Sequence, residues 1–297
     1  MDIGDVTRAG LTSVARLGRR LGLPVDDLRV LSSRGNLLVH LAPAPVLARA
    51  VTLTAATRAD PAAWVAREIG VSAWAASRGG PVAQPTTLVD PGPHDADGLV
   101  VGLMEFRAGT PGRAEGRELG EALAALHAAT ADYPGELPWL APAHEQVGDA
   151  LRTAAAWLPA ATTGALRAHH QRVLADLDGA GSAPVVLHGD AHAGNLLRSG
   201  NGWFWVDLEE TSLGPPEWDL AVLDDPVAIE AYRARTGLVV ADLAPFRAAR
   251  ELEGAVWLQV MARQFPARYR QAADERLAAL LGRAQRARRR PRRSRRS

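Results

Sequence analysis

The sequence predicts an α+β fold in which an antiparallel sheet precedes a mainly helical region. Short extended runs separated by turn residues lie at 28–31, 37–41 and 46–53, a pattern typical of an antiparallel meander. From residue 113 onward, apolar residues recur at helical spacing instead. The change of pattern predicts a sheet layer followed by a helical layer.

The N-terminal part should contain a leading helix, a sheet and one internal helix. Asp60 followed by Pro61 predicts where the internal helix begins, because the aspartate serves as N-cap and proline suits the first helical position. Gly79, Gly80 and Pro81 end it. The expected elements are a helix at 6–21, strands at 28–31, 37–41, 46–53, 86–89 and 99–106, and a helix at 60–78.

The C-terminal part should be a set of amphipathic helices. Leu119, Leu123 and Leu126 lie on one face of the first of them. A further short helix should follow Pro216. The other expected helices lie at 117–129, 147–158, 166–177, 226–235, 245–264 and 271–282.

Composition limits the classes of protein and of site. The chain has 297 residues, 47% hydrophobic and 23% charged, as in a globular protein with a substantial core. It has no cysteine, which excludes disulfides and thiolate zinc sites. All 34 Lys and Arg positions are arginine, so a phosphate group must be bound by arginine, backbone amides or metal. No signal peptide or membrane-spanning run is recognisable, so we expect a cytoplasmic protein without membrane contact.

The C-terminus differs from the rest of the chain in charge. Nine arginines lie in residues 283–297, and without them the chain carries 25 basic and 33 acidic residues. A run of like charges with proline and serine repels itself, so this tail is expected to be disordered. It is suited at most to weak contact with polyanions, and no specific nucleic-acid partner is expected.

A motif in residues 185–207 carries the chemistry. An apolar strand ends at His188-Gly189-Asp190, Asn195 follows five positions later, and a second apolar run ends at Asp207. Gly200-Asn201-Gly202 predicts a hairpin that returns Asp207 to the side of Asn195. Phosphoryl transfer needs one carboxylate for the hydroxyl proton, and an amide with a second carboxylate for magnesium.

Four segments resemble the aminoglycoside phosphotransferase and choline kinase-like family, which belongs to the protein-kinase-like superfamily. They are HGDAHAGN at 188–195, VDLE at 206–209, LGEALAALH at 119–127 and PPEWDLA at 215–221. The resemblance covers roughly residues 28–265. It implies a two-lobed protein-kinase-like fold, with a small antiparallel-sheet N-lobe containing one internal helix and a larger, mainly helical C-lobe.

The resemblance also implies cofactors and residue roles. Residues 1–105 would form the N-lobe over ATP, residues 106–112 the hinge whose backbone meets adenine, and residues 113–282 the C-lobe with the catalytic loop. Asp190 would be the catalytic aspartate. Asn195 and Asp207 would bind Mg²⁺, while His188 would support the catalytic loop through hydrogen bonds.

Two features depart from the kinase pattern. Kinases have a phosphate-binding lysine on the third strand, and this chain has no lysine. Arg49 is the candidate to bind the phosphates in its place, and Glu68 on the next helix is the candidate partner of Arg49. The loop expected to cover the phosphates has a single glycine, Gly35, although Ser32, Ser33 and Asn36 offer possible donors.

The predicted function is transfer of the γ-phosphoryl group of MgATP to a hydroxyl of a small molecule such as an aminoglycoside or amino alcohol. Acidic residues at 209–225 suit a cationic acceptor, but they are equally typical of helix starts and solvated surface. Two alternatives remain. One is a kinase-like nucleotide-binding module with weak or no activity, and the other is a metal-dependent hydrolase using His188, Asp190 and His192.

Overall fold

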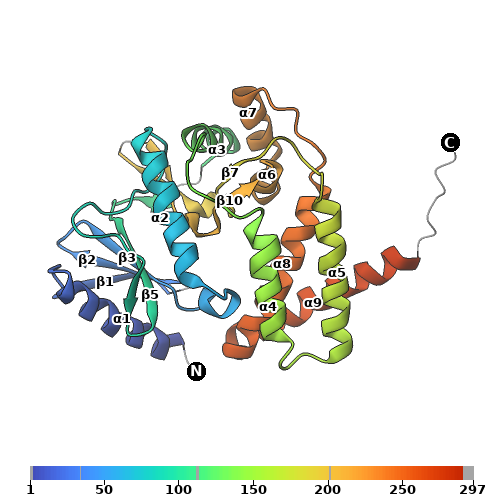
Figure 1. The fold of residues 1–297 in the computed structure, drawn as a ribbon, viewed down its shortest axis with the longest axis horizontal. Helices are drawn as coiled ribbons and strands as arrows, with labels where there is room; N and C mark the ends of the chain where they lie inside the picture. Colours follow the sequence, from blue (N-terminus) through green and yellow to red (C-terminus); the bar gives the residue numbers. More distant parts are fainter. Residues whose placement is uncertain (1–2, 34, 112–113, 201, 290–297) are drawn as a thin grey trace.

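The structure is a computed structural model that describes residues 3–33, 35–111, 114–200 and 202–289 (Figure 1). A sheet with the helices α1 (Ile3–Arg20) and α2 (Pro61–Ser77) forms one part. A larger group of helices, with α8 (Ala244–Gln264) at its centre, forms the other. This arrangement confirms the predicted two-lobed α+β fold.

The N-lobe sheet is antiparallel throughout, with the strand order β1-β2-β3-β5-β4. Its strands are β1 (Asp27–Ser32), β2 (Leu37–Ala42), β3 (Val46–Ala50), β4 (His94–Ala96) and β5 (Leu99–Glu105). In the centre, Arg49 of β3 lies opposite Gly102 of β5. The candidate arginine is therefore on the strand that the sequence predicted.

The helices α1 and α2 cover opposite faces of this sheet. Leu103 belongs to the same buried cluster as Leu17 of α1, whereas a Cβ on its neighbour Gly102 would lie 2.9 Å from Val65 of α2. Successive residues of a strand point to opposite faces, so the two contacts lie on the two sides of β5. The predicted cap is also present, since Asp60 Oδ1 accepts a hydrogen bond from the backbone N–H of Ala63 at 3.1 Å.

One predicted strand is wrong. Residues 86–89 form no strand, and β4 at His94–Ala96 pairs with β5 in their place. Thr86 donates one backbone hydrogen bond to Leu103 at 3.1 Å, but the chain then bends away. Prolines at 85, 91 and 93 remove backbone donors from this segment, which prevents a continuous ladder.

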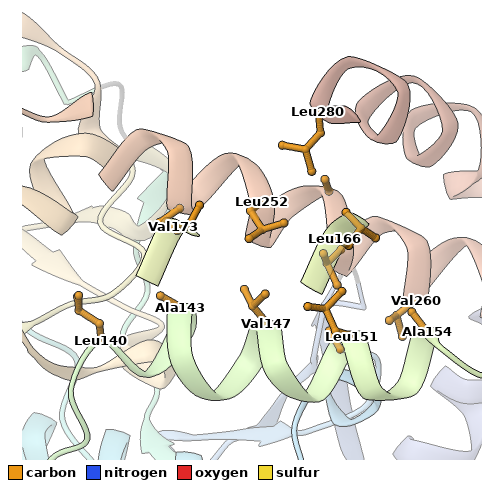
Figure 2. Close-up of a cluster of buried hydrophobic side chains, with 14 of the residues drawn as sticks. Leu140, Ala143, Val147, Leu151, Ala154, Leu166, Val173, Leu252, Val260 and Leu280 are labelled. Carbon is orange, nitrogen blue, oxygen red and sulfur yellow. The ribbon is translucent and has the colours of Figure 1, made fainter. Parts of the chain in front are cut away.

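The C-lobe packs its helices around a core shown in Figure 2, where Leu151 of α4, Leu166 of α5 and Leu252 of α8 meet. Its helices are α3 (Gly116–Ala129), η2 (Pro142–Gln146), α4 (Val147–Ala154), α5 (Ala160–Leu177), α6 (Glu217–Leu223), α7 (Pro226–Thr236), α8 and α9 (Pro266–Arg289). Short strands lie between α5 and α6. They are β7 (Val185–Leu187), β8 (Leu196–Ser199), β9 (Gly202–Trp205) and β10 (Ser212–Gly214).

The connection predicted at 106–112 runs from β5 into β6 (Thr110–Pro111), which pairs with β8 of the C-lobe. The backbone N–H of Phe106 donates to the carbonyl of Pro45 at 2.9 Å. Its ring stacks on His40 with a centroid separation of 3.6 Å. This segment therefore contacts strands of both parts, while Gly112 lies outside the described residues.

The predicted start of the disordered tail is corrected, because α9 continues to Arg289. Leu280 is buried in the C-lobe core, and Arg283 pairs with Glu251 of α8 at 2.9 Å. These contacts hold the helix beyond residue 282. Residues 290–297 of the predicted tail lie outside the described part. None of the helices over the described ranges is long and apolar enough to cross a membrane.

Gly120 gives a test of the contact between α3 and α7. A Cβ at this position would lie 2.0 Å from the carbonyl oxygen of Ala228, so Gly120→Ala should destabilise the protein by about 3 kcal/mol. Gly164 of α5 is the matched control, because a Cβ there meets no atom within 4 Å. Gly164→Ala should stabilise by about 0.5–1 kcal/mol. Urea unfolding measures both, and equal stabilities would contradict this packing.

Candidate active site

The motif in residues 185–207 forms one compact unit in the C-lobe. The strand β7 pairs with β10, and β8 pairs with β9 in the predicted hairpin. The backbone N–H of Val206 donates to the carbonyl of Asn195 at 2.9 Å, and Asn195 Nδ2 donates to the carbonyl of Asp190 at 3.0 Å. The hairpin therefore brings Asp190, Asn195 and Asp207 together, as predicted. Asn201 of its turn lies outside the described residues.

The side chain of His188 binds the backbone of the motif at 185–207 on both sides of its ring. Its side chain is fully buried, with Nε2 donating to the carbonyl of Val206 at 3.1 Å and Nδ1 accepting from the backbone N–H of Asp190 at 3.3 Å. Burial lowers the pKa of its imidazole, which favours the neutral ring that these two bonds require. Both ring nitrogens are thus engaged with the backbone, which weighs against a role as metal ligand and against the hydrolase alternative.

The carboxylate of Asp219 fixes the start of the loop at 188–195, the candidate catalytic loop. It accepts hydrogen bonds from the backbone N–H groups of His188 at 2.8 Å and Gly189 at 2.9 Å. His127 donates to it from Nε2 at 3.0 Å, and Tyr232 lies 2.8 Å from the other ring nitrogen. Burial alone would raise the pKa of Asp219, but these donors lower it. The buried charge therefore holds the loop in place.

Gly189 is required by the geometry of the loop. Its φ is +93°, a region that side chains other than glycine rarely adopt. A Cβ there would lie 2.3 Å from the carbonyl oxygen of Glu210. The absence of a side chain thus lets the catalytic loop approach the segment after Asp207.

Arg49 and Glu68, predicted from the kinase pattern, form a buried ion pair. Arg49 also pairs with Glu209, and its Nη1 lies 3.7 Å from Asp207 Oδ1. The guanidinium therefore connects the N-lobe sheet and helix to the end of the catalytic motif. This position is the one expected for the cation that meets nucleotide phosphates.

Arg58 was not singled out from the sequence, and Glu209 was named only as part of the acidic run at 209–225. Arg58 is buried, with Nη1 lying 2.9 Å from Glu209 Oε2, and its guanidinium lies 4.2 Å from the ring centroid of Trp64. Burial alone would raise the pKa of Glu209, but Arg58 and Arg49 lower it to about 2. Arg58 precedes the helix cap Asp60 in an irregular segment, where sequence gives no signal for such a contact.

The loop between β1 and β2 differs from what was expected. Asn36 is buried, donates to Glu209 Oε2 at 2.7 Å and accepts from the hydroxyl of Thr54 at 2.7 Å. Its amide is therefore committed to internal contacts and is not a free phosphate donor. Gly35 accepts a bond at its carbonyl from the backbone N–H of Leu53 at 3.1 Å.

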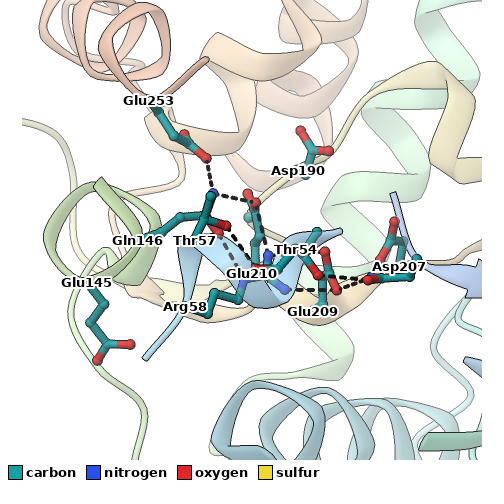
Figure 3. A network of polar contacts seen from close by, with 12 residues as sticks. Thr54, Thr57, Arg58, Glu145, Gln146, Asp190, Asp207, Glu209, Glu210 and Glu253 are labelled. Carbon is teal, nitrogen blue, oxygen red and sulfur yellow. Dashed lines mark hydrogen bonds and ion pairs between the residues drawn. The ribbon is translucent and has the colours of Figure 1, made fainter. Parts of the chain in front are cut away.

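A second buried carboxylate pair lies beside Asp190. Gln146 of η2 donates to Glu253 at 2.8 Å and to Glu210 at 3.1 Å, and Figure 3 shows it between them. Burial raises the pKa of both carboxyl groups, aided by repulsion from Glu253 on Glu210 and from Asp190 on Glu253, with Arg250 opposing. Gln146, Arg250 and Glu253 come from helices far from the motif in sequence, so sequence reasoning missed all three.

The acidic side chains at 209–225 bind other groups of the same chain. Glu217 accepts from the backbone N–H and the hydroxyl of Ser182, Asp224 pairs with Arg247 at 2.7 Å, and Asp225 caps α7. Together with the arginine partners of Glu209 and Glu210 and the backbone donors to Asp219, each acid of this run has a partner. The run therefore supports the interpretation as helix starts and internal contacts.

Asn195 and Asp207 have the chemistry of a magnesium site. The Nδ2 bond of Asn195 leaves its carbonyl oxygen as the ligand atom. The pKa of Asp207 is raised to about 7, because the carboxyl group loses part of its solvation and because Glu209 repels its charge, with Arg49 opposing. The side chain remains 44% exposed. Oxygen ligands with excess negative charge suit a hard divalent cation. The two residues thus fit the metal that the motif implies.

Comparison with known proteins adds independent information. The sequence model of the phosphotransferase enzyme family matches residues 48–235, more than half of the chain. The chain belongs to this phosphotransferase family. Its membership confirms the resemblance found in the sequence, and it confirms the prediction that the protein is a phosphotransferase. No curated protein matches it in sequence.

Solved structures of phosphotransferases and kinases share its fold. A choline/ethanolamine kinase family protein from Mesorhizobium loti is 20% identical, with a TM-score of 0.59, covering 98% of this chain and 96% of that chain. Amicoumacin kinase hAmiN, in complex with AMP-PNP, Ca²⁺ and Ami, is 13% identical, with a TM-score of 0.69 and coverages of 92% and 93%. The aminoglycoside phosphotransferase APH(3'')-Id from Streptomyces rimosus, in complex with ADP and streptomycin, is 17% identical, with a TM-score of 0.52 and coverages of 84% and 97%.

The anchoring role of Asp219 is testable through pH. Asp219→Asn should destabilise the phosphotransferase by about 3 kcal/mol at pH 7, because charged hydrogen bonds are lost and an amide N–H group faces donors. The folded-state pKa is below the ordinary 3.8, so the contribution is present above 3.8 and lost as pH falls through the folded pKa. Denaturant unfolding should show a constant difference from pH 5 to 8 that shrinks below about pH 4.

Asp224, whose pair with Arg247 is exposed, is the control for that measurement. Asp224→Asn should cost less than about 1 kcal/mol at every pH. A difference for Asp219→Asn that persists unchanged to low pH would contradict a charge-based anchor.

Proposed function

We propose that this enzyme transfers the γ-phosphoryl group of MgATP to a hydroxyl group of a small molecule, with Asp190 as the base. The observation that carries the proposal is the convergence of Asp190, Asn195 and Asp207 within a hydrogen-bonded loop. A carboxylate, an amide and a second carboxylate are the groups this chemistry requires.

In the proposed mechanism, Asp190 orients the acceptor hydroxyl and takes its proton as the oxygen bonds to the γ-phosphorus. The bond from that phosphorus to the β,γ-bridging oxygen breaks, and ADP leaves. The side chain of Asp190 is partly accessible, which a base needs in order to meet an acceptor. Asn195 and Asp207 would hold the magnesium ion. Bound to ATP, that ion neutralises charge on the phosphate oxygens. The protein contributes mainly by positioning and by fixed charges.

Arg49 is proposed to bind the nucleotide phosphates in place of the usual lysine. Its ion pair with Glu68 supports this role, because that pair fixes the guanidinium at the N-lobe side of Asp207. An arginine presents a planar fork that suits two phosphate oxygens at once. The chain has no lysine to compete for the role.

We retain the N-lobe and the hinge predicted from sequence. Residues 1–105 would cover the nucleotide, 106–112 would meet adenine through backbone groups, and the C-lobe from residue 113, which α9 extends to Arg289, would carry the catalytic loop. The end of β5 at Glu105 and the start of α3 at Gly116 support these boundaries. The cytoplasmic location stays a prediction of the sequence.

A small acceptor is favoured over a protein. The short segment after Asp207 forms η4 (Leu208–Glu210) and then β10, which pairs with β7 and leads into α6. It leaves little chain for a long activation loop. Structural neighbours named for choline, aminopropanol and aminoglycosides suggest the first acceptors to screen, together with neutral and anionic alcohols. MgATP consumption with each acceptor is the test.

Replacement of the proposed base separates binding from chemistry. Asp190→Asn should lower turnover by about 10²–10⁴-fold, because the amide cannot accept the hydroxyl proton. Nucleotide affinity, measured by calorimetry, should stay near that of the parent. Asp178→Asn, at an exposed helix end, should change neither. A parent that binds MgATP but turns over no acceptor would favour the alternative of a nucleotide-binding module, and equal turnover in Asp190→Asn would refute the base.

The proposed metal ligand is tested by nucleotide titrations with and without magnesium. In the parent, magnesium should tighten ATP binding, whereas in Asp207→Ala it should have little effect because one of two protein ligands is lost. The exposed Asp224 supplies the control, Asp224→Ala. Magnesium-dependent tightening that survives in Asp207→Ala would exclude Asp207 as a ligand.

A further inference from the structure

Arg250 of α8 contacts the proposed base directly. Its Nη2 donates to Asp190 Oδ1 at 2.5 Å. About three quarters of the Arg250 side chain is removed from solvent, since 23% remains exposed. This pair is therefore unlike the exposed ion pairs on the same helix, and it involves the carboxylate for which chemistry is proposed.

Arg250 is held on several sides. Its Nη1 donates to Glu253 Oε2 at 2.8 Å and to Glu210 Oε2 at 3.2 Å. The guanidinium also lies 5.5 Å from the ring centroid of Trp218. Nη1 binds the carboxylates of Glu253 and Glu210, and Nη2 binds Asp190. The planar guanidinium therefore links Asp190 to this carboxylate pair.

The carboxylates that hold Arg250 are themselves fixed. Gln146 donates to both Glu253 and Glu210, as Figure 3 shows. Glu210 also lies 3.5 Å from Arg58 Nη2. Groups from η2, η4 and α8 thus orient Arg250. Arg250 Nη1 also donates to the carbonyl of Gly189, beside Asp190, at 3.4 Å.

The catalytic loop itself supplies no comparable cation. Between Asp190 and Asn195 the sequence AHAG contains one basic side chain, His192. Its Nε2 lies 3.5 Å from Asp190 Oδ2, beyond a normal hydrogen bond, and the side chain is about half exposed at 49%. The two oxygens of Asp190 therefore differ: Oδ1 is firmly bound by Arg250, and Oδ2 is not.

We propose that Arg250 is a positioning residue for phosphoryl transfer, which binds Oδ1 of Asp190 so that Oδ2 is presented to the acceptor hydroxyl. The inference rests on the proposed role of Asp190 as base. Arginine suits this task because separate nitrogens bind Asp190 and Glu253 at fixed spacing. A lysine ammonium is a single point charge on a flexible stem and cannot fix both groups in the same way.

The test compares Arg250→Ala, Arg250→Lys and the control Arg247→Ala. Arg247 lies one turn earlier on α8 and forms an exposed pair with Asp224 at 2.7 Å. For each protein, kcat and the KM for ATP are measured with the best acceptor of the screen and, separately, for MgATP hydrolysis with water as acceptor. Thermal unfolding of each variant identifies loss of fold.

Arg250→Ala should lower kcat by about 10²-fold, because a misdirected base loses the alignment with the acceptor. The KM for ATP should change little, since Arg250 does not contact Arg49, Asn195 or Asp207 in the part of the chain described. Added guanidinium at low, non-denaturing concentration should restore part of the lost kcat. Arg250→Lys should be intermediate, and Arg247→Ala should match the parent with and without guanidinium.

Two results would overturn the inference. One is an unchanged kcat in folded Arg250→Ala and Arg250→Lys. The other is a loss of kcat that guanidinium does not restore and that is matched by an equal loss of ATP affinity, as a purely structural residue would give. A parent without turnover of MgATP toward any acceptor or water would overturn the proposed function itself, and with it this inference.

Discussion

Burial of several carboxylates with few cations is the constraint on which this molecule depends. Buried carboxylates are costly unless each is paired, and removal of one partner from a buried pair typically costs about 3–5 kcal/mol. Here three arginines and one glutamine lie between the acids, from the N-lobe to the loop that holds Asp190. The sequence of contacts is Glu68, Arg49, Glu209, Arg58, Glu210, Gln146, Glu253, Arg250 and Asp190.

This network joins the stability of the fold to the geometry of the site. Arg49 and Arg58 come from the N-lobe, whereas their shared partner Glu209 belongs to the C-lobe. The same contacts therefore hold the two lobes together and orient the groups proposed for phosphate and metal. Asp219 adds a second anchor beneath the loop, through backbone donors instead of arginines. Rigid support of this kind is what precise positioning requires.

The catalytic motif was predictable because its geometry is local. Short strands and a hairpin set the positions of Asp190, Asn195 and Asp207. The sequence specifies these strands through its apolar runs and the hairpin through its glycine-containing turn. Arg49 and Glu68 were predictable only through the resemblance to kinases. Arg58, Gln146 and Arg250 were not, since each reaches the motif through tertiary packing across 60 or more residues. The missed strand β4 had an unused signal: Asp97-Gly98, both with positive φ, forms the tight turn to β5.

Arginine in place of lysine at position 49 has a chemical consequence outside catalysis. A reactive acyl group attached to a nucleotide phosphate can be transferred to a neutral amine, such as that of a deprotonated lysine, because such an amine is a nucleophile. A guanidinium remains charged at neutral pH and offers no such amine, and this chain contains no lysine elsewhere. An amine-directed nucleotide reagent that binds at the proposed site should therefore leave its arginine unlabelled.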